Sequence, residues 1–191
     1  MNQKVLFKDS RSRQQIVQIY IILENALYSF EVYRKVKVYF DRERSVSNPY
    51  EDELWSHIAN DCLQMGIVQW TKVFGAVDNN QVHYSHWICQ REMIYRLQEK
   101  NVDAKKTYDS MTCFRNKYVA HKDLESVKVP FIDDAILTIY VLDNVMRERY
   151  NLEWLSERFN DLESTHEAYM IRIESEIEAL AHNGISHLFV E

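Results

Sequence analysis

The segment from Arg115 to His121 contains the residue types in this chain that are best suited to chemistry on a phosphate. The guanidinium group of Arg115 offers forked N–H donors that match phosphate oxygens, and Asn116 adds a polar amide beside it. Histidine, here His121, is the side chain whose unperturbed pKa lies near neutrality. These groups suit general acid–base attack at a phosphodiester. In RNA the neighbouring 2′-hydroxyl is the nucleophile, so cleavage to a cyclic phosphate and a 5′-hydroxyl requires no metal.

An arginine and a histidine at this spacing also occur in ordinary helices, as a surface ion pair and a helix-terminal histidine. On a straight α-helix, six residues at about 100° each place Arg115 and His121 about 120° apart and about 9 Å along the axis. The two side chains would then not share a face. Two copies of the segment that meet across a two-fold axis would bring two arginines and two histidines into one cleft. We therefore expect a homodimer to build the site.

The apolar residues that must position this segment recur at three- and four-residue steps, the spacing of buried helical faces. A chain of 191 residues suits one domain, and its three glycines and two prolines leave few turns. We expect an all-α, single-domain bundle of about five to six helices, with long first and last helices and a core over residues 10–150. Asp103 is the expected cap of the fourth helix, and Pro130 is expected to open the fifth. The other helices are expected over about residues 10–40, 48–73, 87–99 and 152–182.

The last of these helices, over about 152–182, has the alternating three- and four-residue steps of a narrow coiled-coil-like seam. Such a seam packs either on a neighbouring helix of the same chain or on a second subunit, and the spacing leaves both open. His166 lies in the seam, where a histidine is more typical of a satisfied packing residue than of a ligand. The seam consists of Leu152, Leu155, Phe159, Leu162, His166, Tyr169, Ile173, Ile177 and Leu180.

Composition limits the classes of function. The net charge of −6 argues against a protein that coats nucleic acid through a broad basic face, so any RNA contact must be local. No run of about 18 apolar residues and no signal peptide is present, which predicts a soluble, cytoplasmic protein that does not enter the membrane. The three cysteines have no paired close spacing, so we expect reduced, mostly buried thiols.

Other chemistry-bearing side chains favour structural roles. His57, His83 and His86 have loose spacing, and no cysteine or carboxylate completes a ligand set, so we expect no metal and no cofactor. Trp70 and Phe74 lie one helical turn apart, which is more typical of a core pair than of a base-stacking platform.

Two stretches of the chain resemble a known superfamily. Phe114 to Asp123 resembles the HEPN signature, in which an arginine and a polar residue are followed a few positions later by a histidine. Trp70 to Gly75, followed by Asn79-Asn80 and His83, is similar to the abortive-infection AbiU branch of that superfamily. The resemblance covers roughly residues 55–146. It implies a helical bundle, a dimer that brings the two motifs together, and a metal-independent endoribonuclease that acts as a toxin or in phage defence.

Carried onto this sequence, the resemblance assigns Arg115 to phosphate and transition-state binding, and His121 to acid–base work. It assigns Asn116 to orienting the substrate or the catalytic pair. Substrate contacts are expected from Lys117 and Lys122, which add positive charge, and from His83, for which helix capping is an equal explanation.

The resemblance has one departure and leaves one alternative. Some HEPN toxins carry, two positions after the histidine, a tyrosine that a partner nucleotidyltransferase modifies, whereas this chain has Asp123. Silencing by that route is therefore not expected, although an antitoxin protein stays among the implied partners. The alternative is a non-catalytic helical module that dimerises or binds a nucleotide or protein, which the acidic charge and the long C-terminal seam favour.

Overall fold

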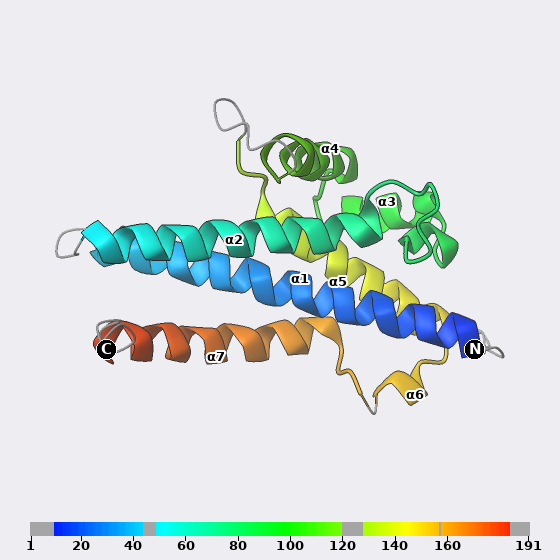
Figure 1. Ribbon diagram of the computed structural model, residues 1–191. Coiled ribbons are helices and arrows are strands. Elements are labelled where there is room, and N and C mark those ends of the chain that lie inside the picture. Colours follow the sequence, from blue (N-terminus) through cyan, green and yellow to red (C-terminus); the bar gives the residue numbers. More distant parts are fainter. Residues whose placement is uncertain (1–9, 44–48, 120–127, 157, 184–191) are drawn as a thin grey trace.

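The computed structural model describes residues 10–43, 49–119, 128–156 and 158–183, which form a helical bundle (Figure 1). The predicted all-α fold is confirmed. Two short segments take other helical forms, the 3-10 helix η1 (Tyr84–His86) and the π-helix η2 (Arg115–Val119). The α-helices of the described residues are α1 (Ser10–Glu43), α2 (Pro49–Phe74), α3 (Gln90–Glu99), α4 (Ala104–Phe114), α5 (Ile132–Arg149), α6 (Glu153–Ser156) and α7 (Leu162–Asn183).

The centre of the bundle is α1, which lies between α2 and α7 in Figure 1, while α4 lies on the far side of α2 and α3 lies near the C-terminal end of α2. The face of α1 that the spacing predicts is buried, as expected for apolar side chains that recur every three or four residues. Its residues Ile16, Ile19, Tyr20, Leu23, Leu27 and Phe30 belong to the main core.

One contact between α1 and α2 depends on a glycine. A Cβ atom added to Gly66 would lie 2.5 Å from both Cδ1 and Cε1 of Phe30, well inside van der Waals contact. The Phe30 side chain is 0% exposed, and the close packing of protein cores leaves a buried ring little room to shift. Gly66 therefore allows the two longest helices to pack directly on each other.

The prediction of one continuous helix over about 152–182 is wrong, because the chain breaks between α6 and α7. The break is stabilised by two carboxylates. Asp161 accepts a hydrogen bond from the Ser164 backbone N–H at 2.8 Å, and Oδ2 of the buried Asp143 accepts one from the Leu162 backbone N–H at 2.8 Å. Both bonds satisfy N–H groups at the start of α7 that have no partner within the helix.

Asp143 also binds two other parts of the fold. Its Oδ1 accepts hydrogen bonds from the Tyr20 hydroxyl on α1 and from Nε of Arg147, the latter at 2.8 Å. Burial and the adjacent Asp143 carboxylate raise the pKa of Tyr20, which keeps its hydroxyl a donor. One carboxylate therefore connects α1, α5 and the start of α7.

Most of the C-terminal seam that lies on α7 packs within the chain, against α1, whereas its last member, Leu180, is 46% exposed. Ile173 and Ile177 of α7 form a second apolar cluster with Val36 of α1 and Trp55 of α2. At the opposite edge, Nζ of Lys35 lies 2.9 Å from a Glu174 carboxylate oxygen. The coiled-coil-like spacing therefore describes an intramolecular contact.

His166 has the structural role that its place in the seam predicts. Its ring is 2% exposed, with Nδ1 bonded to the Tyr140 hydroxyl and Nε2 3.2 Å from a Glu31 carboxylate oxygen. Burial alone would raise the pKa of Glu31, but the hydrogen bond from His166 and the charge of Arg34 lower it below its ordinary value. The buried carboxylate thus has partners on two sides.

Three helix boundaries bear on the site. The Asp103 side chain caps α4 by accepting from the Lys106 backbone N–H at 3.0 Å, as predicted. α5 begins at Ile132 rather than at Pro130, and α3 begins at Gln90 after the separate turn η1, so both predicted starts are too early.

Within the described ranges, none of the helices combines the length and the apolar character needed to cross a membrane.

Candidate functional site

A cleft of about 390 Å³ lies where the end of α2 and the loop after it face α4 and η2. It brings together residues from the two stretches that are 40 or so positions apart in the chain. Thr71, Lys72, Gly75, Ala76 and Asn80 come from the first stretch, Arg115 and Asn116 come from the second, and Val68, Val82, Tyr108 and Thr112 complete the lining.

Arg115 and Asn116 form one hydrogen-bonded unit on the cleft wall. The Arg115 Nη1 donates to Oδ1 of Asn116 at 3.0 Å, and both residues are exposed. This bond occupies one of the five N–H donors of the guanidinium group. Among the described residues, no carboxylate lies within ion-pair distance of Arg115, so its charge is available to an anion.

The backbone at this point is a π-helix, and this changes the expected geometry. η2 runs from Arg115 to Val119, directly after α4, and the Phe114 and Tyr118 rings contact each other with centroids 4.8 Å apart. The separation of about 120° between Arg115 and His121 assumes α-helical spacing, so that premise is wrong over η2. Short π-helical turns are frequent at functional sites. His121 and Lys122 lie outside the described residues.

The opposite wall is built by the end of α2. Lys72 is exposed and donates from Nζ to Oε1 of Gln69 at 3.0 Å, so a second cation lines the same cleft as Arg115. The Asn80 amide donates to the Lys72 and Ala76 carbonyl oxygens, at 2.7 and 3.2 Å. It thereby satisfies carbonyl groups at the C-terminal end of α2. Asn79 has a φ of 56°, the left-handed conformation that asparagine tolerates in such a turn.

Thr112 adds an unpartnered polar atom to the cleft. Its Oγ1 is buried and has no hydrogen-bond partner among the described residues. A buried hydroxyl without a partner costs roughly 1–3 kcal/mol, and such groups usually have a ligand or water partner. The accessible polar groups of the cleft are therefore two cations and an amide, a set that fits a phosphate group, while the Thr112 hydroxyl is buried behind its surface.

His83 is buried in the wall between the cleft and its neighbour. Its Nε2 lies 3.0 Å from the Gly75 carbonyl oxygen, and its Nδ1 accepts from the Ser85 backbone N–H at 3.1 Å, which together specify a neutral ring protonated on Nε2. Burial lowers the pKa of His83, which favours this neutral form. The capping role is thus present, and both ring nitrogens of the predicted substrate residue are occupied by protein partners.

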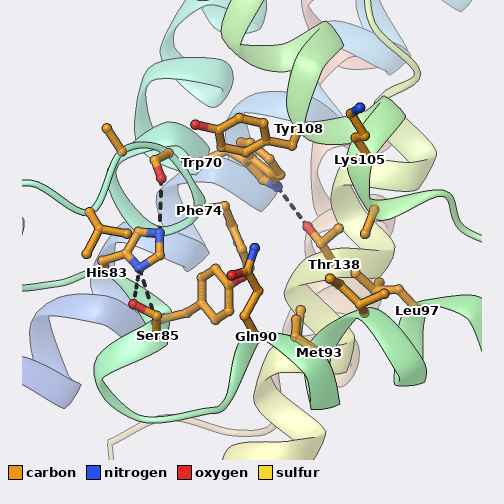
Figure 2. Close-up of a pocket in the computed structure, with 16 residues that line it drawn as sticks. Trp70, Phe74, His83, Ser85, Gln90, Met93, Leu97, Lys105, Tyr108 and Thr138 are labelled. Atoms are coloured by element: carbon orange, nitrogen blue, oxygen red, sulfur yellow. Dashed lines mark hydrogen bonds between the residues drawn. The ribbon is translucent and has the colours of Figure 1, made fainter.

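A second, more apolar pocket of about 460 Å³ lies on the other side of Gly75 and Ala76 (Figure 2). Trp70 and Phe74 form part of it and are 2% and 5% exposed, so their predicted core role is confirmed. The Trp70 indole N–H donates to Oγ1 of Thr138 at 2.8 Å. Their spacing gave no sign that they also line a pocket. The other residues that line the pocket include Tyr84, Ser85, Gln90, Met93, Ile94, Leu97, Lys105 and Tyr108.

The remaining candidate residues lie elsewhere. Lys117 is exposed on η2 and lines neither cavity. In the part of the chain that the structure describes, no group of three histidine, cysteine, aspartate or glutamate residues is arranged to hold a metal ion.

All the cysteines are free, but the expectation that most are buried is wrong. Cys89, before the first turn of α3, and Cys113, on the outer face of α4, are exposed, whereas Cys62 is half-buried.

No protein-family model matches this chain, and it resembles no curated protein and no solved structure closely enough for a relationship to be assigned.

Proposed function

We propose that this protein is a metal-independent endoribonuclease of the HEPN type, related to toxins or phage defence, that binds an RNA phosphodiester in the cleft between α2 and η2. The observation that carries the proposal is the meeting of Arg115, Asn116 and Lys72 in one cleft. The guanidinium and ammonium groups supply charge-assisted donors to phosphate oxygens.

Each residue has a distinct role in the proposed reaction. A base removes the proton from the 2′-hydroxyl, the oxygen attacks the phosphorus, and the 5′-oxygen leaves with a proton from an acid. His121 is the group proposed to move protons. Arg115 stabilises the charge on the phosphorane-like transition state, and the 3.0 Å bond to Asn116 holds its guanidinium in place. No metal or cofactor takes part in these steps.

The proposed site depends on a homodimer and on local charge. A second subunit would supply a second copy of Arg115 and His121, and Lys117 and Lys122 would add positive charge near the substrate. The net charge of −6 makes these few cations the main attraction for RNA. Specific activity should fall as the protein is diluted below its dimer dissociation constant, and a monomer of full activity would contradict a shared site.

The direct experiment incubates purified protein with RNA in metal-free buffer and maps the ends of the products. His121→Ala should lower the cleavage rate by about 10²–10⁴-fold, the usual contribution of an acid–base group. Arg115→Ala should lower it by about 10²–10³-fold through loss of transition-state binding. Arg91→Ala is the matched control, because Arg91 is exposed on α3 and lines neither cavity.

Products with 2′,3′-cyclic phosphate ends that depend on both residues would support the proposal. Cleavage that persists at the wild-type rate in pure Arg115→Ala and His121→Ala proteins would reject the assigned site. The second candidate, a non-catalytic module that binds a nucleotide, is favoured by the apolar pocket beside the cleft. RNA binding without any cyclic phosphate product would select that candidate.

A further inference from the structure

The cleft and the apolar pocket share a wall. Gly75, Ala76 and Tyr108 line both cavities, so the two hollows lie next to each other. We propose that the pocket accepts an unpaired base of single-stranded RNA while an adjacent phosphate lies in the cleft, an inference that rests on the proposed function. The pocket would then determine where along an RNA strand the protein binds.

The volume and the aromatic lining of the pocket suit a flat ring. Its volume of about 460 Å³ falls within the range of about 300–1,000 Å³ typical of ligand sites. Phe74 stacks on Trp70 with ring centroids 4.9 Å apart and an interplanar angle of 27°, and Tyr84 lies 5.6 Å from Phe74. The Trp70 N–H donates to Thr138, and Trp70 and Phe74 are 2% and 5% exposed, so these two rings are mostly covered. Tyr108, at 36% exposed, offers the pocket a more accessible aromatic surface.

The mouth of the pocket exposes apolar side chains to solvent. Val77, Ile94 and Tyr108 are 48%, 38% and 36% exposed, and all three line this pocket. They come from the loop after α2, from α3 and from α4, so three separate parts of the chain place apolar surface around one hollow. In Figure 2 the Tyr108 ring lies along the edge of the pocket, above Phe74. Apolar surface gathered around a hollow is typical of a binding site.

The polar groups at the edge fit a base better than they fit a purely apolar ligand. Among the described residues, the Gln90 amide and the Lys105 ammonium have no hydrogen-bond or ion-pair partner, and both line the pocket. They can donate to, and in the case of Gln90 also accept from, the edge of a base. A ligand without polar atoms would leave them unused.

The cationic cleft next to the pocket identifies a nucleotide unit. A phosphate beside Arg115 and Lys72 and an aromatic ring among Phe74, Tyr84 and Tyr108 together match one nucleotide of a strand. Proteins recognise single-stranded RNA by displacing bases from the strand and stacking them on aromatic side chains. Duplex RNA keeps its bases stacked inside and would not fill the pocket.

The test measures binding rather than cleavage. The probe is a fluorescent six-nucleotide 2′-O-methyl RNA, which lacks the nucleophilic hydroxyl, together with a set in which each position in turn is abasic. We expect one position at which loss of the base weakens binding by about 5- to 150-fold, the range for one stacked base. Equal affinity across the whole abasic set would overturn the proposal.

Tyr108→Ala should remove the penalty at that one position. Because Tyr108 also lines the cleft, the result is read as the ratio of the affinities for the intact and the abasic strand, and not from the affinity for either strand alone. Tyr95→Ala is the control, because Tyr95 is 59% exposed on α3 and lines neither cavity. If Tyr108→Ala does not fold, Ile94→Trp serves instead, since an indole at this exposed rim position would fill the mouth. A penalty that persists in a folded variant of either kind would place the base elsewhere and overturn the proposal.

Arg115→Ala separates the pocket from the nuclease. This change should weaken binding of every strand in the set while the penalty at the one position remains. A position-specific penalty in a protein that does not cleave RNA would support the pocket and reject the proposed function. Cleavage that depends on Arg115 and His121 without any such penalty would overturn the pocket and leave the proposed function intact.

Discussion

Replacement of Asp143 by asparagine tests the polar contact that connects α1, α5 and α7. The change keeps the shape of the side chain but converts one acceptor oxygen into an NH₂ donor. Both carboxylate oxygens face donors: Oδ1 faces the Tyr20 hydroxyl and Nε of Arg147, and Oδ2 faces the Leu162 backbone N–H. No rotation of the amide satisfies all three donors, because an NH₂ group must then face at least one of them.

The magnitude follows from these bonds. A buried donor that loses its acceptor costs about 1–3 kcal/mol, and each charge-assisted bond that becomes neutral loses about 1 kcal/mol. Relief from burying a charge offsets part of this cost, and the Arg147 side chain is 24% exposed, which weakens its share. We expect Asp143→Asn to lower the free energy of unfolding by about 3 kcal/mol and the Tm by roughly 6–12 °C.

The assay is urea unfolding followed by circular dichroism at 222 nm. Asp133→Asn is the matched control on the same helix, since the Asp133 side chain is 75% exposed and lies 3.4 Å from Arg34, an arrangement worth about 0–1 kcal/mol. In the double variant with Tyr20→Phe the loss should be smaller than the sum of the two single losses. A change of less than about 1 kcal/mol in Asp143→Asn, equal to that of the control, would show that the three bonds to Asp143 do not stabilise the contact between α1, α5 and α7.

Three further changes test other parts of the structure. Gly66→Ala should lower the free energy of unfolding by about 2 kcal/mol, because overpacking against Phe30 costs up to about 3 kcal/mol and the gain in helix propensity is about 1 kcal/mol. Urea unfolding should show a smaller loss in a Phe30→Leu background if the Phe30 ring is the cause. His83→Gln should lower the free energy of unfolding more at pH 7.5 than at pH 5. The pKa of His83 is lowered in the folded state, so the ring stabilises the protein above the unfolded-state pKa of about 6.5, and this stabilisation is lost as the pH falls through the folded-state pKa. An equal loss at both pH values would contradict the neutral, buried ring. Ile173→Asp should destabilise the fold by several kcal/mol without changing the association state at native pH, because Ile173 is buried within the chain. A folded variant that sediments as a monomer where the wild type sediments as a dimer would contradict this placement.

The sequence predicts the helices whose signals are local. The three- and four-residue steps of α1 specify its buried face, and Asp103 caps α4 through a bond to a backbone N–H three residues away. The break before α7 cannot be predicted from residue spacing. Leu155, Phe159 and Leu162 keep helical spacing and are all buried, although the backbone between them is not helical throughout. Asp161, three residues before Ser164, is the local capping signal that could have located the new start.

The candidate site is less predictable because tertiary contacts create it. Arg115 and Asn116 are recognisable from their residue types, yet nothing in their spacing indicates a π-helix or a cleft shared with Lys72 and Asn80. The apolar pocket is hidden for a different reason. Side chains such as Phe74 have the same spacing whether they fill a core or line a hollow, and only the positions of α3 and α4 decide between the two.

The polar chain of Tyr140, His166 and Glu31 has a consequence for the register of α7. Apolar contacts between two long helices are similar at each turn, and they would permit α7 to slide along α1. A slide of one turn, about 5.4 Å, would leave the Glu31 carboxylate buried without the His166 ring, at a cost of several kcal/mol. Replacing all three by apolar residues should retain the stability but increase amide hydrogen exchange in α7. We infer that these three hydrogen-bonded side chains select one alignment of α7 along α1 among several that apolar packing alone would allow.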